Sequence, residues 1–172
     1  VKKSFPQFFD RLNEIGIQTR ESKNIALIGY RGAGKTSTAR ELSKLTGMNV
    51  ISTDEEISKR VGMRIGDFIS KNGWDKFRKA ESEMIESLKG ADGVIIDCGG
   101  GAVENDNNIK LIKQNGTVFW LRAHVSVLAD RIKDTKNRPS LTGKKSFIDE
   151  IDEVLAKRIP LYRKASDFEV ET

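Results

Sequence analysis

One segment of the chain has the residues and the spacing to bind a nucleoside triphosphate. Residues 29–36 read Gly-Tyr-Arg-Gly-Ala-Gly-Lys-Thr and match G-x-x-x-x-G-K-[ST] in full. Glycines let backbone N–H groups surround phosphate oxygens, Lys35 reaches the β- and γ-phosphates, and the Thr36 hydroxyl ligates Mg²⁺. A chance glycine turn would not also place this lysine and threonine. We therefore predict that ATP is bound by Gly29, Gly32, Ala33, Gly34, Lys35, Thr36 and Ser37.

Three further groups of residues could bind the acceptor of a phosphoryl transfer. Asp54 follows a short apolar run, Arg78 and Glu81 lie three residues apart in a helical segment, and Gly99–Gly101 follow another apolar run. Asp54 also fits the N-cap of a helix over Glu55–Arg60, and Arg78 with Glu81 also fits a surface ion pair. The triple glycine is harder to explain structurally, because glycine costs stability wherever close backbone approach is not needed.

The elements that position these residues alternate between strands and helices. Helical spacing of apolar residues is clearest over Gly73–Leu88, and a helix over Thr36–Leu45 follows the phosphate loop. Short β-rich runs, the last two weaker, are Asn24–Tyr30, Gly93–Cys98, Gly116–Arg122, Val50-Ile51 and Phe168–Val170. This alternation predicts an α/β fold with a parallel sheet covered on both faces. Asp54 then lies at the carboxyl edge of the sheet, where such folds bind ligands.

Composition limits the classes of partner. The net charge of +5 fits either nucleic-acid binding or attraction of a small anion. The basic residues are spread along the chain, with only Lys144-Lys145 as a pair near a loop, so we predict no nucleic-acid partner. No apolar run approaches the roughly 18 residues that span a membrane, and the single Cys98 fits a reducing compartment. We predict a cytoplasmic protein without membrane association.

Residues 1–22 are predicted to form a helical extension before a domain over residues 23–172. Phe8, Leu12 and Ile15 mark one apolar helical face, which Gly16 ends. That face needs a surface to pack against, and either this domain or a neighbouring domain could supply it.

Taken together, these motifs resemble those of the shikimate kinase family, from Asn24 to about Thr172. GGG, F-R-x-x-E and R-x-P-L-Y occur in the family's order, a combination that is specific although each piece is not. The matching segments are the phosphate loop, Asp54, residues 72–81 (NGWDKFRKAE), 99–103 (GGGAV), Arg138-Pro139 and 158–163 (RIPLYR). The resemblance implies a five-stranded parallel sheet flanked by helices, as in P-loop nucleoside monophosphate kinases, and a mobile lid over about residues 134–146. It also implies ATP-dependent, Mg²⁺-assisted phosphorylation of the shikimate 3-hydroxyl in aromatic amino-acid biosynthesis.

The resemblance implies a role for each acceptor residue. Asp54 would bind the acceptor's hydroxyls and orient or deprotonate the attacking one. Arg78 and Arg163 would clamp the shikimate carboxylate, and Gly99–Gly101 would line the acceptor, with backbone N–H donors from Gly100 and Gly101. The clamp is chemically reasonable, because a guanidinium fork matches a carboxylate bidentately.

Two other arginines are assigned to the nucleotide side by the same resemblance. Arg138 would close over the transferred phosphoryl group as part of the lid, and Arg131 would stack on adenine. Phosphoryl transfer needs alignment, charge neutralisation and exclusion of water, which these groups could provide.

The acidic residues near the metal depart from the family pattern. The family usually has D-x-D after the second strand, where this chain has Ser52-Thr53-Asp54. Asp97 stands two residues before the triple glycine, where the family has a small or hydroxyl residue. We interpret this as an exchange that keeps one carboxylate near Mg²⁺, with Thr36, Asp97 and Ser52 around the metal. Both exchanged positions are expected to flank the strand that precedes the phosphate loop. The alternative is that Ser52 marks weakened catalysis and Asp97 is structural.

The chain ends at Thr172, where the family continues into an adenine-pocket loop and a final helix. With the non-Met start, this favours a piece of a longer polypeptide or a trimmed chain. Three functions are therefore considered: shikimate kinase, which the motifs favour; a kinase for another small hydroxy acid or a nucleotide; and a catalytically weakened nucleotide-binding domain of a multifunctional enzyme.

Overall fold

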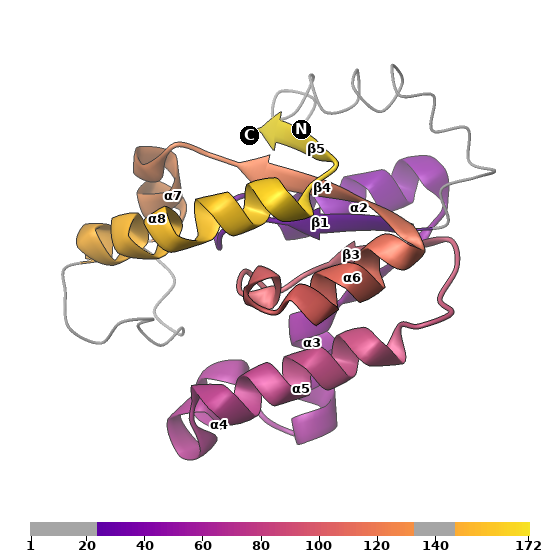
Figure 1. Cartoon of the computed structure of the whole chain (residues 1–172), viewed down its shortest axis with the longest axis horizontal. Helices are drawn as coiled ribbons and strands as arrows, with labels where there is room; N and C mark the ends of the chain where they lie inside the picture. The colour runs from indigo at the N-terminus through magenta and orange to yellow at the C-terminus, as the bar shows by residue number, and fades with distance from the viewer. Residues whose placement is uncertain (1–23, 133–146) are drawn as a thin grey trace.

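The structure is a computed structural model that describes residues 24–132 and 147–172. Its five strands are all parallel and form one sheet in the order β2-β3-β1-β4-β5 (Figure 1). They are β1 (Asn24–Ile28), β2 (Asn49–Ser52), β3 (Val94–Asp97), β4 (Gly116–Arg122) and β5 (Phe168–Glu171). The predicted α/β fold with a five-stranded parallel sheet is therefore confirmed. The proposed extension over residues 1–22 and the proposed lid over 134–146 lie outside the described residues.

Helices connect the strands and cover the sheet on both faces (Figure 1). They are α2 (Lys35–Thr46), α3 (Thr53–Val61), α4 (Ile65–Asn72), α5 (Trp74–Ser87), the 3₁₀ turn η1 (Ala102–Glu104), α6 (Asp106–Gln114), α7 (Val125–Ile132) and α8 (Phe147–Ala165). Helix α4 was not anticipated from the sequence. In the described parts of the chain, no helix has the length and apolar character needed to cross a bilayer.

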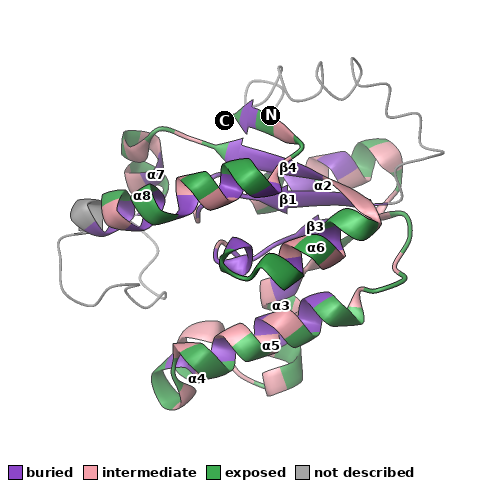
Figure 2. Cartoon of the chain, viewed as in Figure 1, coloured by how far each residue is buried: buried purple, intermediate pink, exposed green. Residues whose placement is uncertain are grey.

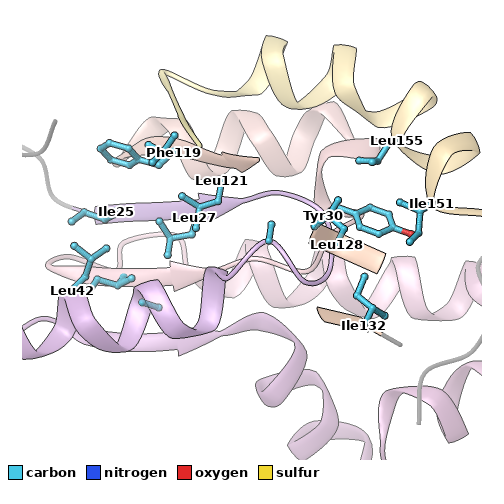
Figure 3. Packing of buried hydrophobic residues seen from close by; sticks show 14 of the residues in the cluster. Ile25, Leu27, Tyr30, Leu42, Phe119, Leu121, Leu128, Ile132, Ile151 and Leu155 are labelled. Carbon is cyan, nitrogen blue, oxygen red and sulfur yellow. The ribbon is translucent and has the colours of Figure 1, made fainter. Parts of the chain in front are cut away.

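The central strands are buried on both faces, as their unbroken apolar runs require. All of β1 is buried (Figure 2). Its apolar side chains alternate between two apolar clusters. Ile25 and Leu27 face the cluster that includes Leu42 of α2 and Leu128 of α7 (Figure 3). Ala26 and Ile28 face the opposite cluster, which holds residues of α5, α6 and α8. The sheet is thus a rigid support for the loops at its carboxyl edge.

A third apolar cluster builds a helical unit beside the sheet. Ile57, Ile69, Phe77 and Met84 join α3, α4 and α5, which lie together beyond the β2 side of the sheet (Figure 1). Because α5 carries Arg78, this unit sets one wall of the cavity described below.

Candidate active site

The phosphate loop joins β1 to α2 and has the backbone conformation that its glycines allow. Gly32 and Gly34 have φ of 81° and 87°, in the left-handed region that side chains disfavour. A Cβ atom on Gly32 would also lie 2.8 Å from Cγ1 of Ile132. Gly34 is the N-cap of α2, so backbone N–H groups at the positive end of that helix border the loop. The predicted loop is confirmed in its strand–loop–helix context.

Lys35 and Thr36 open α2 beside a cavity of about 740 Å³ that the phosphate loop lines. The Lys35 ammonium group donates to the carbonyl oxygens of Gly29, at 2.9 Å, and Tyr30, at 3.2 Å. Ser37 borders the same cavity. The cavity therefore combines a cationic side chain, a hydroxyl and helix N–H groups, which suits the phosphates of ATP.

Arg131, at the end of α7, borders the same cavity. Its Nη1 donates to the carbonyl oxygen of Gly32 at 3.2 Å and to the Thr172 hydroxyl at 3.4 Å. The structure thus places Arg131 beside the phosphate loop, and its predicted contact with adenine stays a prediction.

Asp97 ends β3 next to the phosphate loop. The Thr36 hydroxyl donates to Asp97 Oδ2 at 2.6 Å. Burial raises the pKa of the Asp97 carboxyl, and the nearby Lys35 charge and the Thr36 hydrogen bond partly oppose this shift. A carboxylate fixed to the hydroxyl of the phosphate loop is a suitable donor pair for Mg²⁺.

Ser52 and Asp97 are register partners on the paired strands β2 and β3. The expectation that both strands flank the phosphate-loop strand is wrong for Ser52, because β3 separates β2 from β1. The two side chains nevertheless border one cavity. Ser52, and not Asp54, is the N-cap of α3: its hydroxyl accepts from the Glu55 N–H at 3.4 Å, and α3 begins at Thr53.

A second cavity, of about 580 Å³, lies between the helical unit and the triple glycine. Gly99, Gly100 and Gly101 all border it. A Cβ atom on Gly99 would lie 2.5 Å from Glu81 Oε1, and one on Gly101 would overlap the Arg78 guanidinium. Gly99 and Gly101 are needed because an acidic and a basic side chain pack directly against their backbone.

Arg78 is held in this second cavity by its neighbours on α5. Its Nη1 lies 2.7 Å from Glu81 Oε2, and its guanidinium lies 5.4 Å from the Trp74 ring centre and 5.5 Å from that of Phe77. The Glu81 side chain is only 1% exposed, so this is not a surface ion pair. Burial raises the pKa of Glu81, while the Arg78 charge acts in the opposite direction. Glu81 therefore orients Arg78 towards the cavity.

The expected partner of Arg78, Arg163, does not lie in this cavity. The Arg163 side chain is 64% exposed and pairs with Glu169 at 3.3 Å. Arg158 borders the cavity instead, and its side chain is 8% exposed. The physical reason is helical phase: the Tyr162 hydroxyl donates to the Gly100 carbonyl at 2.5 Å, and Arg158 lies one turn before Tyr162 on the same face of α8. Arg163, one residue after Tyr162, points elsewhere.

Asp54 stands where the two cavities meet. Four residues border both of them: Arg31, Asp54, Glu55 and Gly100. Asp54 Oδ1 is buried and has no hydrogen-bond partner among the described residues. A buried acceptor of this kind is costly unless something donates to it. A hydroxyl on a molecule in the second cavity would donate a hydrogen bond to Asp54. That hydroxyl would also face the cavity that the phosphate loop lines.

Arg31 was missed by the sequence reasoning. This loop residue borders both cavities and pairs with the buried Glu150 of α8 at 2.7 Å. The only signal in the sequence was that Arg31 is a charged residue at a variable position of the phosphate-loop motif. The motif gives no role to that position.

Comparisons with known proteins identify the family. The family model described as "Shikimate kinase" matches residues 31–172. The chain belongs to the shikimate kinase family. It is 43% identical over 150 residues to the shikimate kinase of Thermodesulfovibrio yellowstonii, covering 87% of this chain and 86% of that protein. A shikimate kinase of Dehalococcoides mccartyi is 39% identical over 153 residues, with 89% and 86% covered.

Solved structures of the same family have the same fold. A shikimate kinase from Acinetobacter baumannii in complex with shikimate has a TM-score of 0.83 and 33% identity, covering 87% of this chain and 83% of that one. A deoxyadenosine kinase from M. mycoides, with a TM-score of 0.52 and 17% identity, is similar in fold only. This shikimate kinase family member is thus an ATP-dependent phosphotransferase on a P-loop kinase fold.

Proposed function

We propose that this chain transfers the γ-phosphoryl group of ATP to the 3-hydroxyl of shikimate, which gives shikimate 3-phosphate and ADP. The observation that carries this proposal is the position of Asp54 between a phosphate cavity and a cavity that Arg78 and Arg158 border. An acceptor that offers a carboxylate to the arginines and a hydroxyl to Asp54 would present that hydroxyl to the phosphate loop. Shikimate has both groups on one small ring.

On the acceptor side, Arg78 and Arg158 bind the carboxylate. Two guanidinium groups in fixed positions define both the place and the orientation of a planar anion. Backbone N–H groups of Gly100 and Gly101 lie beside them. Asp54 accepts a hydrogen bond from the attacking hydroxyl and can take its proton as the bond to phosphorus forms.

On the nucleotide side, Lys35 and the N-terminal N–H groups of α2 bind the β- and γ-phosphates. Thr36 and Asp97 would hold Mg²⁺, and Ser52 borders the same place. The described residues contain no cluster of three His, Cys, Asp or Glu side chains that could hold a metal alone. This fits Mg²⁺, which usually takes one or two protein oxygens together with phosphate oxygens and water. When bound, the ion neutralises charge on the phosphates.

Four further expectations remain predictions. Arg138 closes over the transferred phosphoryl group within a lid over residues 134–146, and Arg131 contacts adenine. The protein works in the cytoplasm. Residues 1–22 pack either on this domain or on a neighbouring one.

A substrate comparison tests the proposal. ADP release is measured with shikimate, with shikimate methyl ester, and with nucleoside monophosphates. We expect turnover with shikimate, a large loss of kcat/KM with the ester because it lacks the negative charge, and no reaction with the nucleotides. Equal activity with acid and ester would contradict the carboxylate clamp. Activity with a nucleoside monophosphate alone would favour a nucleotide kinase.

A further inference from the structure

The Glu104 carboxylate contacts two arginines that border the acceptor cavity, Arg78 and Arg158. Its Oε2 lies 3.1 Å from Arg78 Nη2, and its Oε1 accepts from Arg158 Nε at 2.8 Å. Glu104 is the last residue of η1, which directly follows the triple glycine. An internal carboxylate thus bridges the two guanidinium groups that the proposed function assigns to the acceptor's carboxylate.

Contacts besides those with Glu104 also constrain the two arginines. Arg78 is held by Glu81 and by the Trp74 and Phe77 rings. Arg158 is largely buried at 8% exposure, next to Tyr162 on a long helix. The Glu104 side chain is 40% exposed, so it is the member of the cluster that can move at low cost. Its position neutralises two cations that face a poorly solvated cavity.

The negative charges already present disfavour a second carboxylate between Arg78 and Arg158. Glu81 is already paired with Arg78, and Asp54 lies close by, since both carboxylates face Gly99. An acceptor carboxylate bound beside an unmoved Glu104 would place an additional negative charge against the same two guanidinium groups. Like charges at such distances repel. Displacement of Glu104, whose side chain is 40% exposed, would relieve this repulsion.

The structure offers a place for Glu104 to go. A cavity of about 550 Å³ lies on the outer side of Arg78 and is bordered by Glu104, Lys79 and Asn105. The Lys79 side chain is 78% exposed, and its ammonium group lies 3.9 Å from Glu83 Oε1 on the same helix. A rotation of the Glu104 side chain would bring its carboxylate towards this cavity, which Lys79 borders together with the carboxylates of Glu81 and Asp106.

We propose that Glu104 is an internal competitor for the acceptor's carboxylate, a specificity-determining residue that sets the acceptor's affinity. This inference rests on the proposed function of the arginine pair. Shikimate binding replaces the Glu104 carboxylate with the shikimate carboxylate. The arginines therefore contribute less to the affinity than they would if Glu104 did not have to be displaced. Because the exchange is complete before phosphoryl transfer begins, Glu104 affects KM and leaves kcat nearly unchanged.

The test is Glu104→Gln, which removes the charge and keeps the size. Shikimate binding is measured by calorimetry, together with KM and kcat. The Kd and KM for shikimate should fall by about two- to tenfold, the amount expected for loss of two partly exposed ion pairs, with kcat within about twofold. The matched control is Asp106→Asn, two residues away, which removes the same charge from an exposed carboxylate paired with Lys164. It should change Kd by less than about twofold.

The outcomes separate this inference from the proposed function. A Kd that is unchanged or higher in Glu104→Gln would overturn the inference, and so would an equal gain in Asp106→Asn. If the wild-type chain did not bind shikimate, or if Arg78→Ala bound it equally well, the arginine clamp itself would fail. The ADP affinity and the thermal unfolding of each variant show whether it is folded. If Glu104→Gln does not fold, Glu104→Asp tests the same point, because its shorter side chain cannot bridge both arginines and should also tighten binding.

Discussion

Replacing Asp97 with Asn tests whether this carboxylate serves the metal. Asp97 is 5% exposed, and its Oδ2 accepts the Thr36 hydroxyl hydrogen bond at 2.6 Å. Asn keeps an acceptor oxygen in that place and removes only the charge. Since burial already raises the pKa of the Asp97 carboxyl, the neutral side chain should cost no stability without nucleotide. Thermal unfolding should therefore be unchanged or slightly higher, which separates loss of function from loss of fold.

The magnitude follows from the role of the carboxylate. Loss of a group that orients the metal shell typically costs about 10- to 100-fold, or about 1.4–2.7 kcal/mol. We expect turnover to fall by about 10²-fold or more, and the Mg²⁺ concentration needed for half-maximal ADP binding to rise about tenfold. Calorimetric titration of ADP at a series of Mg²⁺ concentrations gives the second quantity without any turnover. Asp92→Asn, an exposed carboxylate in the loop before β3, is the matched control and should change neither.

The exchange with Ser52 is tested by a double-mutant cycle. Ser52 and Asp97 are register partners on β2 and β3, so their side chains can share one ligand. Ser52→Asp alone should be tolerated or slightly harmful, because it adds a carboxylate near Asp97. Ser52→Asp with Asp97→Ser should recover much of the activity that Asp97→Ser loses, with a coupling energy of about 0.5–3 kcal/mol. Strict additivity would refute the shared metal and would favour the interpretation that Ser52 marks altered catalysis.

Four further substitutions have distinct expected results. Lys35→Ala should abolish transfer and leave the fold intact, so turnover within about tenfold of wild type, roughly 1.4 kcal/mol, would contradict the phosphate-loop assignment. Measured by calorimetry, Arg158→Ala should weaken shikimate binding far more than ATP binding. Arg163→Ala, on the exposed face of α8, should change neither affinity by more than about twofold. The reverse result would restore Arg163 to the clamp. Arg138→Ala should lower kcat with modest loss of acceptor affinity, and a pure binding defect in steady-state kinetics would count against its role in the lid.

Local sequence signals predicted the fold and the nucleotide side of the site well. The phosphate loop is contiguous, so eight adjacent residues specify both its backbone and its chemistry. Apolar runs such as Gly116–Arg122 predicted strands because both faces of a parallel sheet are buried. Boundaries shifted by a residue or more, as for the first strand, which ends at Ile28 and not at Tyr30.

The acceptor side depended on contacts that sequence spacing does not reveal. The resemblance assigned Arg163 to the clamp, but the motif does not state which face of α8 turns inward. The Tyr162 hydrogen bond to Gly100 decides it. Arg158 and Tyr162 are spaced by four residues, and this was the available signal. Glu104 meets Arg158 across 54 positions of sequence, and no local pattern predicts such a pair. The sequence analysis placed the N-cap of α3 at Asp54, two residues after the observed N-cap Ser52, because both residue types suit that position.

The most direct test of the account is the reaction itself. Purified chain is incubated with ATP, Mg²⁺ and shikimate, ADP release is followed, and the phosphorylated product is identified by ³¹P and proton NMR. We predict one ADP per shikimate consumed, with phosphate on the 3-hydroxyl and dependence on Asp54 and Lys35. Tight ADP or ATP binding without any transfer to shikimate would contradict the account and would favour a nucleotide-binding domain without kinase activity.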